Sequence, residues 1–213
     1  MSAAAKTTAA KTLPPPARQV LDFWFGDGLS LGWPSTNRSA LWWGGGVTLD
    51  TQIQTQFGDL VEQALNSELR DWETQPDSLL ALVIVLDQFT RNTHRGQARA
   101  FAGDARSQTL VGQAIAKQVD LQLPVAGRVF FYMPLMHSEN LSLQNVCVHQ
   151  FTQLHQQAPD ALQEQVVGNI AFSRQHRDII AQFGRFPHRN QALGRVNTPV
   201  EDEFLKTGPR FGQ

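Results

Sequence analysis

The 213-residue sequence lacks several features that would narrow its function. It has a single cysteine, Cys147, so neither an intrachain disulfide nor a multi-cysteine metal site can form. Its longest apolar run, Leu79 to Leu86, falls far short of the roughly 18 residues of a membrane helix. Lysine plus arginine, 18, nearly equals aspartate plus glutamate, 19. We therefore expect a soluble protein of a reducing compartment, with no membrane span, no general affinity for nucleic acid and Cys147 in its core.

Familiar catalytic and cofactor motifs are absent as well. Residues 26–28 (Gly-Asp-Gly) lack the third glycine of a dinucleotide fingerprint, and residues 44–46 (Gly-Gly-Gly) lack the Lys-Ser/Thr that ends a phosphate loop. Residues 137–139 (His-Ser-Glu) match the start of the zinc-deaminase motif, which needs more thiolates than this chain has. The remaining mixed set of metal-ligand types, which has no tight spacing, is His137, Glu139 and His188. We predict no cofactor and no metal site.

Apolar residues recur with the period of an α-helix along most of the chain. Helices are predicted over residues 20–25, 49–65, 76–88, 101–115, 124–133, 143–154, 160–183 and 198–205. Pro134 is expected to kink or end the fifth helix, Gly184 to end the seventh, and residues 198–201 to cap the eighth. The run Leu79 to Leu86 also fits a buried strand, but its polar continuation favours a helix. The predicted fold class is all-α, built from antiparallel helix pairs.

Composition divides the chain into one domain and two tails. Residues 1–16, rich in Ala, Thr and Lys and closed by three prolines, are expected to be a flexible tail; a cryptic targeting peptide is the less favoured alternative, because no arginine precedes Arg18. Residues 206–213, with two glycines and a proline, are expected to be a second tail. The single domain then spans residues 17–205. All five tryptophans lie in the first third of the chain and are expected mainly to pack in the core.

Charge is unevenly distributed, although the total is near zero. Residues 22–87 carry ten acidic residues and two arginines, whereas residues 88–103 carry three arginines and no acid. Residues 165–200 carry five arginines against Asp178 alone. Arginine, 14 of the 18 basic residues, suits bidentate recognition of carboxylate or phosphate. Two interpretations stay open: salt bridges that neutralise the acidic N-terminal half, or a basic pocket for a small anion.

Three polar segments concentrate the candidate functional residues. Residues 183–190 hold two arginines, a histidine and an amide with no acid beside them; residues 87–92 follow the most hydrophobic helix; residues 136–140 follow Pro134. The ligand-binding candidates are Gln88, Arg91, Asn92, Arg185, Arg189 and Asn190. The catalytic candidates are His137 or His188 as general base and Glu139 or Asp87 as the carboxylate that orients it. A structural clasp at residues 183–190 and a satisfied core histidine at position 137 are the competing interpretations.

These candidates support three hypotheses of function. The first is a helical binding protein whose pocket holds a small anionic metabolite or a carboxylate-bearing peptide. The residues expected to line that pocket are Arg91, His137, Arg185, His188 and Arg189. The second is an enzyme in the same pocket, with arginines stabilising developing negative charge. The third is a protein-interaction scaffold with an exposed apolar groove. We favour the binding protein, with the enzyme and the scaffold as alternatives.

Taken in order, the motifs of the chain resemble those of the bacterial family known as domain of unknown function 924 (DUF924). The matching motifs are VLDFWFG (20–26), LDQF (86–89), RN (91–92), RG (95–96), FA (101–102), PLMHSE (134–139), FGRFPHRN (183–190) and LGR (193–195). Thr90 and residues 97–98 depart from the family pattern. The resemblance covers about residues 20–205. It implies an all-helical fold similar to tetratricopeptide-like superhelices and a cytoplasmic bacterial setting, and it implies no activity.

Overall fold

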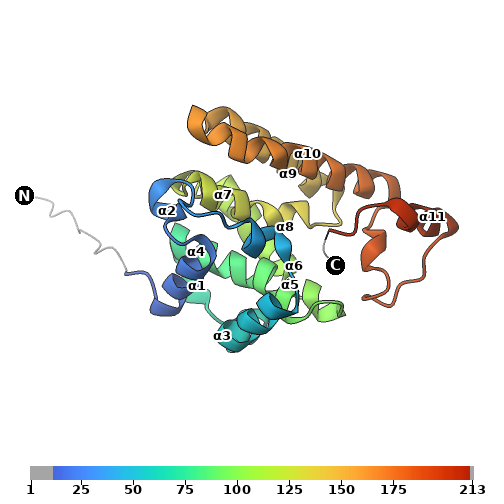
Figure 1. The fold of residues 1–213 in the computed structure, drawn as a ribbon, viewed down its shortest axis with the longest axis horizontal. Coiled ribbons are helices and arrows are strands. Elements are labelled where there is room, and N and C mark those ends of the chain that lie inside the picture. Colours follow the sequence, from blue (N-terminus) through green and yellow to red (C-terminus); the bar gives the residue numbers. More distant parts are fainter. Residues whose placement is uncertain (1–11, 212–213) are drawn as a thin grey trace, which may run out of the picture.

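In the computed structural model, which describes residues 12–211, the chain folds into helices joined by short connections (Figure 1). The α-helices are α1 (Pro15–Phe25), α2 (Gly28–Leu31), α3 (Val47–Leu65), α4 (Pro76–Val83), α5 (Thr90–Thr93), α6 (Asp104–Ala116), α7 (Val125–Phe131), α8 (Met133–Met136), α9 (Leu141–Gln157), α10 (Asp160–Phe183) and α11 (Pro199–Thr207). Two π-helical segments, η1 (Ala40–Gly44) and η3 (Ile84–Phe89), and four short 3-10 segments, η2 (Arg70–Thr74), η4 (Ala98–Phe101), η5 (Asp120–Gln122) and η6 (Pro187–Arg189), complete the list. The described residues contain no strand, which confirms the all-α class.

Several helix boundaries lie where the sequence predicts them. α10 is one unbroken helix, and Gly184 ends it in the left-handed conformation, with a φ of 68°. Thr198 and the side chain of Glu201 form the expected capping box at the start of α11. Pro134 lies in α8, which the turn at Tyr132 separates from α7. Proline has no backbone N–H to donate, so the hydrogen-bond ladder of α7 cannot continue through Pro134.

The most hydrophobic helix is longer and less regular than predicted. α4, η3 and α5 follow one another without a break from Pro76 to Thr93, and the middle segment is π-helical rather than α-helical. The Thr90 hydroxyl donates to the carbonyl of Val85, five residues back, at 2.9 Å. Residues 78–87 are all buried. A π-helical turn shifts the register of the side chains that follow it, and such turns recur at functional sites.

The core forms around rings from distant segments. Trp24 and Phe25 of α1 pack edge-on against Phe130 of α7, and Trp24 also contacts Phe89 at the end of η3. Cys147 is fully buried with a free thiol, as expected. The prediction for the tryptophans is correct for Trp24, Trp42 and Trp72, which are buried, whereas Trp43 is 56% exposed. Among the described residues, no helix combines the length and the apolar character that crossing a bilayer requires.

The last helices form a separate layer over the rest. α9 and α10 are joined by residues 158–159 only, and they run antiparallel along one side of the molecule, above α7 and α8 in Figure 1. α11 lies at the right of Figure 1, and the chain after it returns toward α10, where Phe211 packs against His176. The site described below is located between α10 and residues 41–47.

Both predicted tails need correction at the boundary. α1 begins at Pro15, inside the predicted N-terminal tail, because proline suits the first turn of a helix, where its missing N–H costs nothing. Residues 1–11 of that tail lie outside the described part of the chain. α11 extends to Thr207, and Phe211 beyond it packs against His176. The C-terminal segment therefore belongs to the domain up to Phe211.

Candidate functional site

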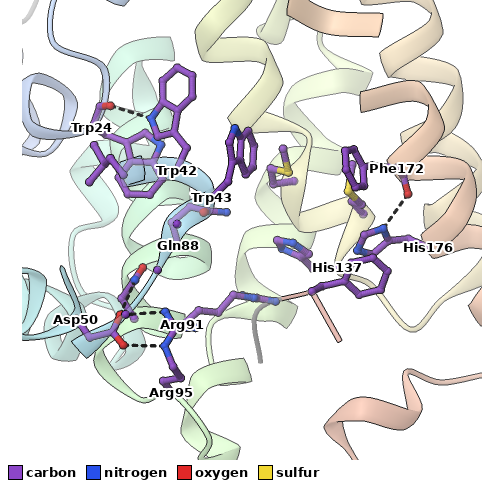
Figure 2. Close-up of a pocket in the computed structure, with 18 of the residues that line it drawn as sticks. Trp24, Trp42, Trp43, Asp50, Gln88, Arg91, Arg95, His137, Phe172 and His176 are labelled. Carbon is purple, nitrogen blue, oxygen red and sulfur yellow. Dashed lines mark hydrogen bonds and ion pairs between the residues drawn. The ribbon is translucent and has the colours of Figure 1, made fainter. Parts of the chain in front are cut away.

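A cavity of about 870 Å³ lies between α10 and residues 41–47 (Figure 2). α5 and η3 contribute polar side chains to its floor, α8 contributes two methionines, and η6 and Phe211 also border it. The lining residues come from segments spread from Trp24 to Phe211, so the cavity exists only once the helices have packed.

One face of α10 forms a whole side of the cavity. Its residues, which recur every three or four positions and therefore share a helix face, are Gln165, Gly168, Asn169, Phe172 and His176. His176 Nδ1 lies 2.8 Å from the carbonyl oxygen of Phe172, one turn back. None of these residues was a sequence candidate. Of the five, only His176 lies in the polar stretch at residues 173–178, and the sequence carries no comparable signal for the other four.

The facing side is largely apolar. Trp42 and Trp43 come from η1, and Met133 and Met136 come from α8. The Trp42 indole N–H donates to the carbonyl of Trp24 at 3.0 Å, which fixes its ring, while Trp43 stays 56% exposed. Trp43 also stacks on Phe130, with an angle of 15° between the rings. Flat aromatic faces and flexible thioethers are suited to an apolar or planar group of a ligand.

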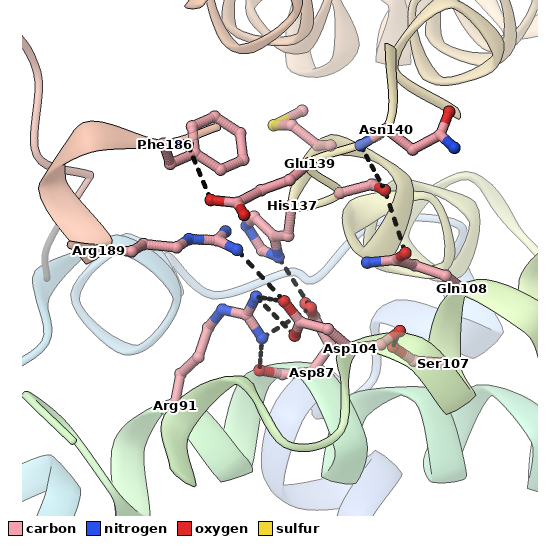
Figure 3. A network of polar contacts seen from close by, with 12 residues as sticks. Asp87, Arg91, Asp104, Ser107, Gln108, His137, Glu139, Asn140, Phe186 and Arg189 are labelled. Atoms are coloured by element: carbon pink, nitrogen blue, oxygen red, sulfur yellow. Dashed lines mark hydrogen bonds and ion pairs between the residues drawn. The ribbon is translucent and has the colours of Figure 1, made fainter. Parts of the chain in front are cut away.

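The polar floor is built on a buried carboxylate. Asp87, 1% exposed, accepts hydrogen bonds from His137 Nδ1 at 2.8 Å and from Gln88 Nε2 at 2.6 Å (Figure 3). Arg91, one turn further along the helix, places Nη1 3.0 Å from Asp87 Oδ1. His137, Gln88 and Arg91 line the cavity, whereas Asp87 lies behind them.

A second carboxylate joins two guanidinium groups. Asp104, at the start of α6, lies 2.9 Å from Arg91 Nη2 and 3.3 Å from Arg189 Nη1. Arg189 is 6% exposed and lies over the rings of Phe101 and Phe186, at 4.7 and 4.5 Å from their centroids. Its Nε has no hydrogen-bond partner within residues 12–211. We call Asp87, Arg91, Asp104, His137 and Arg189 the cavity cluster.

Burial and neighbouring charges shift the pKa values of this cluster. Burial opposes ionisation of Asp87, but Arg91 and His137 outweigh it and lower its pKa to about 2. Burial lowers the pKa of His137, partly offset by Asp87, and burial together with Arg91 lowers that of Arg189 to about 10. At neutral pH Asp87 is therefore ionised, Arg91 and Arg189 are charged, and His137 is a neutral imidazole.

The two other histidines of the cavity are also neutral. Burial, followed by the charge of His137, lowers the pKa of His176 to about 3. Burial, followed by the charge of Arg189, lowers that of His188 to about 3. His188 Nδ1 is buried and has no hydrogen-bond partner among the described side chains and backbone groups.

A separate ion pair borders the cavity at α3. Asp50, in the first turn of that helix, accepts hydrogen bonds from Arg95 Nε at 2.7 Å and Nη2 at 2.9 Å. Asn92 Nδ2 donates to the same carboxylate at 2.8 Å. Burial opposes ionisation of Asp50, but these bonds lower its pKa overall. They fix Asn92 and Arg95 at the edge of the cavity.

The structure brings together some sequence candidates and separates others. Those that line the cavity are Gln88, Arg91, Asn92, His137, His188 and Arg189. Arg185, Asn190 and Glu139 are not lining residues. The expectation that no acid lies near residues 183–190 is wrong, because Glu201 and Asp104, both distant in sequence, pair with Arg185 and Arg189. The expectation that Arg185 lines the pocket is wrong for the same reason.

Arg185 and its neighbours form a structural clasp. Arg185 Nε and Nη2 bind Glu201 at 2.6 and 2.8 Å, and Arg195 binds Glu139 at 2.7 and 2.9 Å. Glu139 also accepts the backbone N–H of Phe186, and Asn190 accepts from Arg195 Nε. We call Arg185, Arg195, Asn190, Glu139 and Glu201 the clasp.

The described residues hold no group of three or more metal-ligating side chains, so His137, Glu139 and His188 do not form a metal site there.

Comparison with known proteins agrees with the resemblance noted in the sequence. The family model for bacterial proteins of unknown function called DUF924 matches residues 20–209. No curated protein matches the chain. The fold is similar to the solved structure of a protein of unknown function, ATU0120, from Agrobacterium tumefaciens, with a TM-score of 0.73 and 32% sequence identity over 90% of this chain and 97% of that one. The chain belongs to the DUF924 family of bacterial proteins.

Proposed function

We propose that the cavity binds a small anionic metabolite that carries a flat apolar group beside its carboxylate or phosphate. The observation that carries this proposal is the arrangement of Arg91 and Arg189: both guanidinium groups are buried and line the cavity, while their carboxylate partners do not line it. Asp87 and Asp104 hold the arginines from behind. The side toward the cavity therefore presents positive charge and N–H donors to a ligand.

An unused donor strengthens the case for an anion. A buried polar group without a partner costs roughly 1 to 3 kcal/mol, so proteins seldom leave one unsatisfied. Arg189 Nε is such a group, and a guanidinium N–H donates most strongly to a carboxylate or phosphate oxygen. His188, neutral and equally unpartnered at Nδ1, adds a neighbouring polar group that carries no competing charge.

The size and the apolar side of the cavity define the rest of the ligand. A volume of about 870 Å³ lies within the range of roughly 300 to 1,000 Å³ typical of small-molecule sites. Trp43 and Phe172, each 56% exposed, line the cavity from opposite sides and offer apolar surface to a planar group. A peptide ending in an aromatic residue with a free carboxylate has the same chemistry and falls within the proposal.

We also propose a tetratricopeptide-like arrangement of the helix pairs and a cytoplasmic location. The α9–α10 hairpin, with its two-residue connection, is the kind of unit from which such superhelices are built. A single buried free thiol suits a reducing compartment.

Calorimetric titration with phenyl phosphate and benzoate tests the binding proposal. Benzyl alcohol, which keeps the ring without the charge, and inorganic phosphate, which keeps the charge without the ring, are the reference ligands. We expect both aromatic anions to bind more tightly than either reference. Arg189→Met should weaken phenyl phosphate binding by about 10- to 100-fold, the loss of one charge-assisted hydrogen bond or two.

Arg185→Met is the matched control, because this arginine lies in the same loop but outside the cavity. It should leave the affinity unchanged. Equal weakening by both substitutions would show a general loss of structure, and absence of binding by both aromatic anions would refute the proposal.

A further inference from the structure

We infer that the cavity is a catalytic site in which His137 acts as general base and activates water to hydrolyse an ester or amide bond of the bound anion. The inference rests on the proposed function, because the arginines would hold the substrate. It goes beyond binding, since an imidazole fixed by a buried carboxylate is not needed to recognise an anion.

The contact with Asp87 determines which nitrogen of His137 is available. An ionised carboxylate only accepts hydrogen bonds, so Nδ1, 2.8 Å from Asp87 Oδ1, must carry the proton. In the neutral ring Nε2 then holds the lone pair. Nε2 has no hydrogen-bond partner within the described chain, and the ring lines the cavity. The nitrogen that can take a proton from water is therefore Nε2.

Asp87 is itself held in place. Gln88 Nε2 donates to its second oxygen at 2.6 Å, and Arg91 Nη1 lies 3.0 Å from its first. At 1% exposure it cannot reach a ligand, so it is a positioning residue. It keeps the His137 ring in one orientation and stabilises the imidazolium that forms when Nε2 takes a proton, which is the role of the carboxylate in histidine-based hydrolases.

The other histidines of the cavity lack this arrangement. His176 Nδ1 contacts a backbone carbonyl, and the ring of Phe211 stacks on its imidazole at 3.8 Å between centroids. His188 Nδ1 has no partner in the described structure. Of these three lining histidines, His137 is the one with a carboxylate behind it (Figure 3).

The lining residues also restrict the attacking group. They include no serine, threonine, cysteine, lysine or tyrosine within the described chain, so the usual side-chain nucleophiles for a covalent intermediate are missing. Asp50, the one carboxylate among the described lining residues, is held by Arg95 and Asn92, so water is the remaining nucleophile. His137 Nε2 removes a proton from water as its oxygen bonds to the carbonyl carbon, and the carbonyl electron pair moves to oxygen. The bond to the leaving oxygen or nitrogen then breaks, and that atom takes the proton from Nε2.

Arg91 and Arg189 favour this step electrostatically. Their positive charges act on His137 closely enough to lower its pKa, so they also act on a substrate placed beside Nε2. Negative charge develops on the carbonyl oxygen during attack, and fixed cations in a site shielded from water stabilise it.

Hydrolysis of the adipic acid half-ester of 4-nitrophenol tests the inference. This probe has a carboxylate at one end, an aromatic ring at the other and an ester near the ring, and 4-nitrophenyl acetate is the uncharged comparison. We expect wild type to hydrolyse the half-ester with the higher kcat/KM, and more slowly in D2O than in water. The kcat should stay constant as pH falls through 6.5, the ordinary value for histidine, and should fall only at lower pH, because burial lowers the pKa of His137.

His137→Gln should lower kcat by about 10²- to 10⁴-fold, the usual contribution of a general base, with little change in KM. His137→Asn gives a second variant in case one fails to fold. His149→Gln, an exposed histidine of α9 away from the cavity, is the matched control.

Wild-type kcat in both folded variants would overturn the inference. So would a burst of nitrophenolate without a solvent isotope effect, because His137 would then attack as a nucleophile. No hydrolysis by a wild type that binds phenyl phosphate would refute catalysis and leave the binding proposal intact, whereas no binding would refute the proposed function itself.

Discussion

In the clasp, Arg185 uses two nitrogens of its guanidinium on one carboxylate, that of Glu201, whereas in the cavity cluster Arg91 and Arg189 share Asp104. Arg195 and Glu139 repeat the first pattern. A bidentate pair satisfies both partners and has little left to offer a ligand. When two arginines share one carboxylate, some of their N–H groups have no acceptor, as is the case for Arg189 Nε.

Comparison of the clasp with the cavity cluster shows that a high density of arginine in the sequence does not identify a binding site. Arg185 and Arg189 are four residues apart, yet one closes a structural contact and the other lines a cavity. Burial separates them further, since the Arg185 side chain is 28% exposed and that of Arg189 is 6% exposed. The cavity cluster, which is the more deeply buried of the two, has the shifted pKa values that are typical of functional sites.

The largest expected effect comes from breaking the cavity cluster at its base. Asp87→Asn removes a buried charge and leaves Arg91 without one of its two partners, which should lower the free energy of unfolding by about 3 to 5 kcal/mol. Urea unfolding followed by tryptophan fluorescence measures it. Asp178→Asn, whose side chain is 65% exposed and paired with Arg177, should change stability by less than about 1 kcal/mol. Similar losses in the two variants would contradict the buried pairing of Asp87.

The pH dependence of stability distinguishes the histidines of the cavity from the clasp. The pKa values of His176 and His188, about 3 when folded against 6.5 for the free side chain, mean that the unfolded chain binds more protons in this range. Their contribution to the free energy of unfolding is therefore fully present above pH 6.5. It decreases as pH falls toward 3, by up to about 1.4 kcal/mol per histidine and pH unit. In the clasp, Arg185 lowers the pKa of Glu201 from 4.5 to about 2. The contribution of this ion pair to the free energy of unfolding is therefore lost only below pH 4.5.

Unfolding free energies at pH 7, 6 and 5 therefore report on the cavity and not on the clasp. His176→Gln should flatten this part of the pH dependence, and Glu201→Gln should leave its slope unchanged. A wild-type stability that stays constant from pH 7 to pH 5 would show that the two histidines are not buried as neutral groups.

Sequence patterns were sufficient for the helices and insufficient for the contacts between them. The α10 boundaries and the capping box of α11 follow from local chemistry, because glycine, proline and capping residues act within one turn. His137 and Asp87 were recognised as a base and a carboxylate, but 50 residues separate them, and only packing shows that they touch. Glu201 was assigned to a cap, and its second role, pairing with Arg185, has no local signal.

The smallest expected effect concerns Phe211, a residue that composition assigned to a loose tail. Its ring stacks on His176 at 3.8 Å between centroids, with 27° between the planes, and it lines the cavity. Phe211→Ala should cost about 0.5 to 1.5 kcal/mol of stability, the usual worth of an aromatic pair. Because burial is the main cause of the low pKa of His176, opening this side should also raise that pKa toward 6.5. Titration by NMR measures it, with Val200→Ala, an exposed site on α11, as the control. An unchanged pKa would mean that other groups, chiefly those of α10 itself, bury the imidazole, and that the C-terminal segment contributes nothing to the electrostatics of the cavity.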